Sequence, residues 1–143
     1  MVATQLATLA AAPLSQSADF DIVRMTQTNV LFLGGDRYST PKVLDEIRPY
    51  LDEPVMQWRA GERLRLPVVP RRGTLILDGL DGMSLDDQCR LLEWLDGVER
   101  STRVVSTAAE SLRGRIDAGA FFEELYYRLN TVCIDVDAAE SGN

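Results

Sequence analysis

The sequence contains no histidine, a single lysine (Lys42) and only two cysteines among its 143 residues. The lack of histidine excludes a Ser-His-Asp triad, a histidine-ligated zinc site and an imidazole pH switch. Two cysteines do not make a disulfide framework, and Cys89 and Cys133 both lie within apolar patterns. We therefore expect buried, reduced thiols in a cytoplasmic protein.

Positive charge and long apolar runs are also scarce. The 15 basic side chains are outnumbered by 22 acidic ones, and the net charge of −7 predicts no direct DNA binding. No run reaches the ~20 apolar residues of a membrane span, so no membrane contact is expected. Residues 1–18 carry no charge and lack the basic start of a signal peptide. We interpret them as a short helix or loose arm before a single domain at 19–143.

Short strands alternate with helices along that domain. Runs rich in Val, Ile and Leu predict buried strands, and a fifth run, Val55–Trp58, is less pronounced. The four clearer runs are Val30–Leu33, Thr74–Leu77, Arg103–Ser106 and Thr131–Val136. This alternation predicts an α/β fold, a three-layer parallel sheet of about five strands with helices on both faces.

Four helices are predicted between these strands. The first follows Thr40, and the second begins at Ser84 and stops at Gly97. The last two are expected over Glu110–Ala118 and Phe121–Leu129. The apolar stripes of the first two helices are Val43, Leu44, Ile47 and Leu51, and Leu85, Cys89, Leu92 and Leu95.

Arginine is concentrated between the second and third expected strands. The stretch Arg59–Arg72 holds five arginines, one glutamate and two prolines. This composition predicts an exposed basic loop or an irregular hairpin. Two interpretations remain open: the stretch contacts an acidic partner, or it is a solvated face that balances an acidic domain.

Two strand ends carry the parts of a P-loop nucleotide site, which lies beyond the carboxyl ends of parallel strands. A glycine pair follows the first strand, a helix follows the glycines, and Asp78 ends the next buried strand. The candidate nucleotide-binding residues are Gly34, Gly35, Ser39, Thr40 and Lys42, and Asp78 is the candidate magnesium residue. The full pattern G-x-x-x-x-G-K-[ST] is incomplete, however, because its second glycine is absent. By spacing alone this is a poor phosphate site.

Three segments resemble the AAA+ ATPase domain of sigma-54-dependent transcription activators, the bacterial enhancer-binding proteins. They read GTLILDGLDGMSLDDQCRLLEWLDG from Gly73, RVVSTAAESL from Arg103 and GAFFEELYYRLNTVCIDV from Gly119. The segment VLFLGG at Val30 extends the similarity to the first strand. The resemblance implies a P-loop NTPase-like fold, with Asp78 at the magnesium-associated Walker B position.

The sequence departs from this family at the positions that carry ATP hydrolysis there. Thr40 falls on the phosphate-binding lysine, and Lys42 substitutes for it only if the loop shifts by two residues. Gly79 stands at the catalytic glutamate, and Ala108–Ala109 stand at the polar sensor pair. Of the family's two interface arginines, the first is Phe122 and only Arg128 remains.

Other parts of the family pattern are missing from the sequence. The G-A-F-T-G-A motif that engages sigma-54 is absent, and the chain ends at Asn143 where a lid subdomain would begin. We therefore expect no lid and no sigma-54 contact.

The departures predict a non-enzymatic pseudo-ATPase that acts as a protein-interaction module in bacterial transcriptional or signalling control. Its expected contact surface includes Phe121, Phe122 and Arg128, and its expected partner is an intact AAA+ activator or a second copy. No cofactor is expected. The alternative is a sensor or weak ATPase that binds ATP or ADP with magnesium through Lys42 and Asp78, with a partner completing the site. A third alternative is a regulatory fragment of a longer activator.

Overall fold

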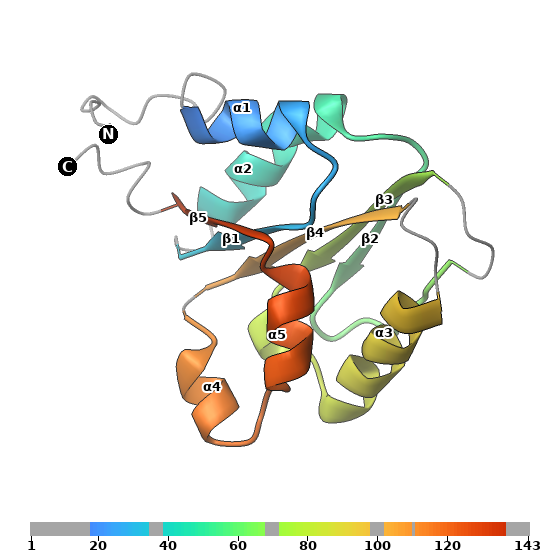
Figure 1. The fold of residues 1–143 in the computed structure, drawn as a ribbon, viewed down its shortest axis with the longest axis vertical. Helices are drawn as coiled ribbons and strands as arrows, with labels where there is room; N and C mark the ends of the chain where they lie inside the picture. The colour runs from blue at the N-terminus through green and yellow to red at the C-terminus, as the bar shows by residue number, and fades with distance from the viewer. Residues whose placement is uncertain (1–17, 35–38, 68–71, 98–101, 110, 137–143) are drawn as a thin grey trace.

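The computed structural model describes residues 18–34, 39–67, 72–97, 102–109 and 111–136 (Figure 1). Its strands form one parallel sheet in the order β2-β3-β4-β1-β5. The strands are β1 (Val30–Leu33), β2 (Val55–Arg59), β3 (Gly73–Asp78), β4 (Thr102–Ala108) and β5 (Val132–Asp135). The predicted sheet, including its less pronounced fifth strand, is confirmed.

Helices cover both faces of this sheet. In Figure 1, α1 and α2 lie on one side and α3, α4 and α5 on the other, which gives three layers. The helices are α1 (Ala18–Met25), α2 (Ser39–Ile47), α3 (Leu85–Gly97), α4 (Arg113–Asp117) and α5 (Glu123–Leu129). Two short 3-10 turns, η2 (Arg48–Tyr50) and η3 (Leu80–Gly82), complete the described elements.

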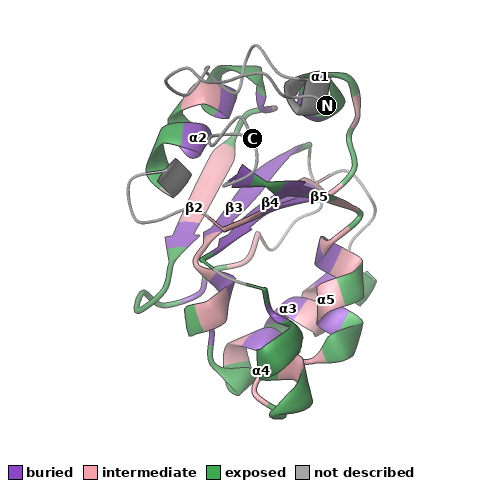
Figure 2. Ribbon diagram, turned by 90° about the vertical axis from the view of Figure 1, so that its left-hand side faces the viewer, coloured by how far each residue is buried: buried purple, intermediate pink, exposed green. Residues whose placement is uncertain are grey.

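Successive strand residues point to opposite faces, so the sheet separates two hydrophobic cores. In β1, Leu31 packs toward the α3 and α5 side, whereas Val30 and Phe32 pack toward α1 and α2. In β3, Leu75 and Ile76 divide in the same way. Figure 2 shows the result, with buried strands in the middle and exposed residues on the outer helix faces. Apolar residues on both faces therefore fix this layered fold.

The buried face of α3 differs from the predicted one. Leu95 is buried and Leu92 packs against the core as predicted, but Leu85 is 43% exposed and Cys89 is exposed. Gln88 and Leu91 are buried in their place, and Nε2 of Gln88 donates to the carbonyl oxygens of residues 83 and 120, both at 3.0 Å. Its Oε1 accepts the backbone N–H of residue 122 at 2.9 Å. Gln88, whose amide nitrogen and oxygen are both hydrogen-bonded, therefore lies at the buried face to which the predicted stripe had assigned Leu85 and Cys89.

Both cysteines are exposed, which corrects the expectation of buried thiols. Cys89 lies on the exposed side of α3, since Gln88, Leu91 and Leu95 face the core. Cys133 lies in β5, which pairs with β1 and forms one edge of the sheet. The apolar residues around each cysteine in the sequence were therefore not evidence of burial.

The ends of several predicted helices also change. The helix expected over Glu110–Ala118 is confined to α4, and the helix expected over Phe121–Leu129 begins only at Glu123. Helix α1 was not predicted from the sequence. The predicted arm at 1–18 falls almost wholly outside the described residues.

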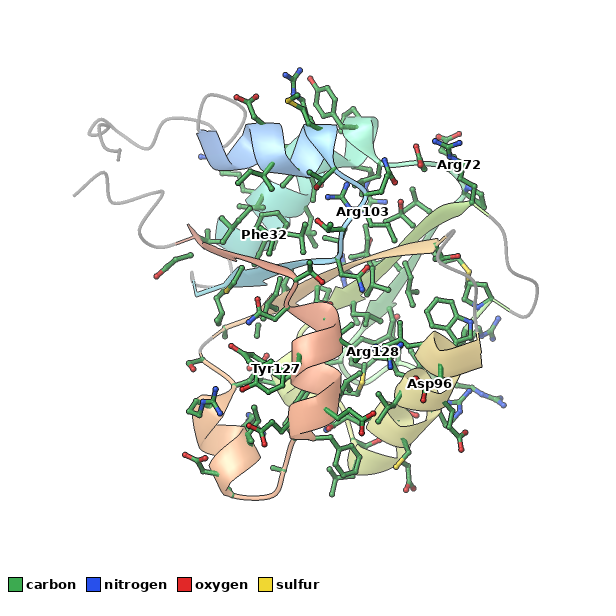
Figure 3. All side chains as sticks on the ribbon, in the orientation of Figure 1. Phe32, Arg72, Asp96, Arg103, Tyr127 and Arg128 are labelled. Atoms are coloured by element: carbon green, nitrogen blue, oxygen red, sulfur yellow. The ribbon has the colours of Figure 1, made fainter. Side chains whose placement is uncertain are left out.

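A buried arginine holds α1 against the sheet. Arg103 is only 4% exposed, and its guanidinium donates to the carbonyl oxygens of Thr28 at 2.7 Å and Val23 at 2.9 Å (Figure 3). Burial lowers the pKa of Arg103, with Asp52 opposing the shift. Because Val23 lies in α1 and Arg103 in β4, these bonds join the helix layer to the sheet.

Candidate functional site

Strand register brings three polar side chains into one row at the carboxyl edge of the sheet. Arg59 at the end of β2 pairs with Asp78 at the end of β3, and Asp78 pairs with Thr107 in β4. Ligands of open parallel sheets bind beyond this edge. Asp78, the predicted Walker B residue, therefore lies at this edge, at the end of β3.

The Asp78 carboxylate is engaged on both oxygens by neighbouring strands. Oδ1 accepts the Thr107 hydroxyl at 2.8 Å, and Oδ2 lies 3.6 Å from Nε of Arg59. The Asp78 side chain is 20% exposed, whereas that of Arg59 is 66% exposed. The Thr107 contact is therefore the more sheltered of the two, and the Arg59 ion pair is partly screened by solvent.

Gly79 follows Asp78 with a backbone that favours glycine. Its φ of 99° and ψ of 59° are left-handed, a region in which a Cβ is strained. Its N–H is directed at Thr107, 2.9 Å from the side-chain Oγ1 and 3.2 Å from the carbonyl oxygen. In the resembled family this position holds a catalytic glutamate. Here it is Gly79, whose backbone N–H is bonded to β4.

The predicted phosphate-binding residues are only partly in view. The N–H of Gly34 donates to the Ala108 carbonyl oxygen at 2.9 Å, and its φ is 86°. This N–H therefore continues the sheet rather than pointing at a ligand. Gly35 and the side chains of Ser39 and Thr40 lie outside the described residues. Lys42 is exposed in the first half of α2.

The described residues contain no cluster of three or more acidic or thiol side chains suited to a metal ion. Asp81, the carboxylate next along the chain, lies 3.4 Å from the N–H of Ala109. Asp78, the predicted magnesium residue, thus lies at the strand edge without such a cluster among the described residues. No helix in the described ranges is long and apolar enough to cross a membrane.

The predicted interface residues separate into three environments. Phe121 is 2% exposed and belongs to the core, which corrects its placement on a contact surface. Phe122 is half-buried against the same core. Arg128 forms an ion pair with Asp96 of α3, and Figure 3 shows the two side chains side by side between α5 and α3. The exposed aromatic of this element is instead Tyr127, at 59%.

Arg59 and Thr107 were not predicted as members of the strand-edge row. Arg59 was assigned only to the basic stretch, and Thr107, one residue past the predicted strand Arg103–Ser106, appeared only within the segment RVVSTAAESL. Register between the strands brings them together, because paired residues of neighbouring parallel strands lie side by side. Register is set by pairing in space and cannot be read from one strand alone.

Comparison with known proteins agrees with this geometry. Residues 52–138 match the family described as the sigma-54 interaction domain. The match covers more than half of the chain and includes β2 to β5. This protein belongs to the sigma-54 interaction domain family, the AAA+ region of transcriptional regulators.

Curated relatives are regulators of transcription. The chain is 39% identical over 75 residues to the C4-dicarboxylate transport transcriptional regulatory protein DctD of Pseudomonas aeruginosa. It is 39% identical over 71 residues to the DNA-binding transcriptional regulator NtrC of Rhizobium meliloti. These matches cover 45% and 42% of this chain, but only 16% and 15% of the relatives.

Solved structures confirm the P-loop NTPase-like fold. NtrX from Brucella abortus in complex with ADP superposes with a TM-score of 0.65 at 21% identity, over 82% of this chain and 34% of that one. The same protein in complex with ATP gives 0.64 at 20% identity, over 85% and 36%. At these identities the likeness establishes the fold.

Proposed function

We propose that this chain is a non-catalytic sigma-54-activator-type AAA+ core that regulates transcription through protein contacts. The observation that carries the proposal is the closed strand edge at Asp78 and Gly79. ATP hydrolysis at such an edge needs a carboxylate free for the metal and a polar group that orients water. Here the carboxylate bonds Thr107 and Arg59, and the next residue has no side chain.

Restoring the catalytic carboxylate would strain the backbone. A side chain at Gly79 would have to adopt φ near 99°, with its Cβ 3.4 Å from the Cβ of Ala60. General-base assistance is typically worth ~10²–10⁴-fold in rate. The loss of this carboxylate, together with a backbone that disfavours its return, supports a role without turnover.

Arg128 supports the same conclusion from the opposite side of the domain. In hydrolysing NTPases an arginine supplied to a neighbouring site stabilises the transition state, by ~10³–10⁵-fold. Arg128 is 25% exposed and is paired with Asp96 of its own chain. To reach another subunit it would first have to leave this ion pair. We also place the protein in the cytoplasm, the site of bacterial transcription, where its free cysteines stay reduced.

The alternative function is nucleotide sensing through Lys42 and Asp78. It is favoured by the exposure of Lys42 on α2. Thermal unfolding with and without millimolar ATP and magnesium separates the two functions. A ligand at ~100 times its dissociation constant adds about 2.7 kcal/mol of stability, which raises the melting temperature by several degrees.

We expect a shift of less than about 1 °C for the wild-type chain and the same for Lys42→Ala and Asp78→Ala. Asp45→Ala is the matched control, because Asp45 is an exposed charged residue of α2. A magnesium-dependent shift in the wild type and in Asp45→Ala that disappears in the other two variants would establish the nucleotide sensor and overturn the proposal.

A further inference from the structure

The connection after β2 is pinned to the core by two tryptophans. Nε1 of Trp58 donates to the carbonyl oxygen of Glu62 at 2.9 Å, and Nε1 of Trp94 donates to that of Pro67 at 2.8 Å. Trp58 lies in β2 and Trp94 in α3, so the connection is held at both ends of its described part. We call the residues between these two anchors, Arg63–Leu66, the arginine strip.

Side chains of the arginine strip alternate between the core and solvent. Leu64 is 1% exposed and Leu66 packs partly buried against the same core cluster. Arg63 and Arg65 are exposed. Alternation with a period of two is the pattern of an extended chain, in which residues two apart lie on one side about 7 Å from each other. The buried leucines therefore fix the two guanidinium groups on the outer side.

These two arginines differ from Arg59 and Arg72, which form ion pairs within the described residues. Arg59 pairs with Asp78, and Arg72 pairs with Asp52 at 3.1 Å. Neither Arg63 nor Arg65 bonds or pairs with any other residue in the described ranges. The backbone N–H and C=O groups of the arginine strip likewise have no partner among those residues. Within the described ranges, the strip thus presents two exposed guanidinium groups and main-chain groups that bond no other residue.

We propose that the arginine strip docks an acidic, extended segment of a protein partner. This inference rests on the proposed interaction function and names the chemistry of its partner. An extended segment with acidic residues at alternate positions matches the spacing of Arg63 and Arg65, and arginine bonds carboxylates through two parallel N–H groups. The backbone N–H and C=O groups of the strip, which bond no other residue in the described ranges, pair with the main chain of such a segment, as in β-strand addition.

Charge favours a short acidic segment over a nucleic acid. The chain carries −7 overall, so a long phosphate backbone leaving the strip would meet a surface of like charge. A short peptide contacts the basic strip alone. Because the leucines and tryptophans already hold the strip in place, docking costs little ordering of the loop.

The test is fluorescence anisotropy with a dye-labelled peptide of alternating glutamate and threonine. We expect saturable binding to the full chain, and no binding of the same peptide with glutamine in place of glutamate. The double variant Arg63→Gln with Arg65→Gln should weaken binding about fivefold or more. The control, Arg90→Gln with Arg115→Gln, makes the same change in net charge at exposed arginines of α3 and α4 and should weaken it less than about twofold.

Equal weakening in both double variants would overturn the inference, since binding would then follow net charge alone. Failure of the wild-type chain to bind the peptide would also overturn it, as would tighter, strip-dependent binding of a labelled oligothymidine. Nucleotide binding is tested separately, by thermal unfolding with ATP and magnesium. If the chain binds neither the peptide nor ATP, only the arginine-strip inference is overturned, and the proposed non-catalytic function stands. Unchanged thermal unfolding of both double variants verifies that they are folded.

Discussion

Phe121→Ala is expected to lower the free energy of unfolding by about 3 to 5 kcal/mol, the usual loss for a buried phenylalanine. The side chain is 2% exposed and packs in the core between the sheet and α3 and α5. Domains of this kind are stable by only about 5–15 kcal/mol, so this single truncation removes a large share of the free energy of unfolding. Urea unfolding followed by circular dichroism measures the loss.

Tyr127→Ala is the control for this measurement. Tyr127 lies on α5, six residues along the chain, and is 59% exposed. Its truncation should cost about 1 kcal/mol or less, because it removes one edge-to-face contact with Tyr126 and little buried area. If Phe121→Ala were as stable as Tyr127→Ala, Phe121 would lie at the surface, and its place in a contact surface would be restored.

Gln88→Ala is expected to destabilise the chain by about 3 kcal/mol, since a buried polar group left without its partner costs about 1–3 kcal/mol. The amide is fully buried and makes three bonds, to the carbonyl oxygens of Met83 and Ala120 and from the N–H of Phe122. Its loss frees the start of α5 from α3. Relative to the wild-type chain, the increase in hydrogen-exchange rate should therefore be largest over α5. Urea unfolding should show the loss in the global free energy of unfolding as well.

Glu93→Ala serves as the matched variant for Gln88→Ala. Glu93 is an exposed residue of the same helix, so its replacement changes helix propensity by a few tenths of a kcal/mol at most. A loss of less than about 1 kcal/mol in Gln88→Ala would show that water replaces the three bonds. The hydrogen bonds of Gln88 would then contribute little to holding α3 against the start of α5.

Periodicity and turn residues were enough to predict the fold. Apolar runs indicated the five strands. Val43, Leu44 and Ile47 indicated the buried face of α2, and Leu51, the last residue of the predicted stripe, is buried just beyond η2. Hydrophobic burial decides these features, and it leaves a direct mark on the sequence. The same rule failed on α3, where hydrogen bonding by Gln88 competes with burial of Leu85. A bonded amide in the core leaves no apolar signature.

The candidate site was only partly readable in the sequence. Asp78 was recognised from its place after an apolar run, and Gly79 from the resemblance to the sigma-54 activator family. Their surroundings depend on β2 and β4, and the positions of Arg59 and Thr107 follow from register between strands. Burial of Phe121 was hidden for a similar reason, because adjacent aromatics give no indication of which one a neighbouring helix covers.

Phosphate release from ATP tests the central claim of a non-catalytic core most directly. The full chain is incubated with millimolar ATP and magnesium, and Asp78→Asn, which keeps the size of the side chain, sets the background. Circular dichroism verifies that both proteins are folded. We predict equal release from the two, at the level of contaminating activity. Turnover by the wild-type chain that is lost in Asp78→Asn would show that the closed strand edge opens to a working ATPase site, and would contradict the account.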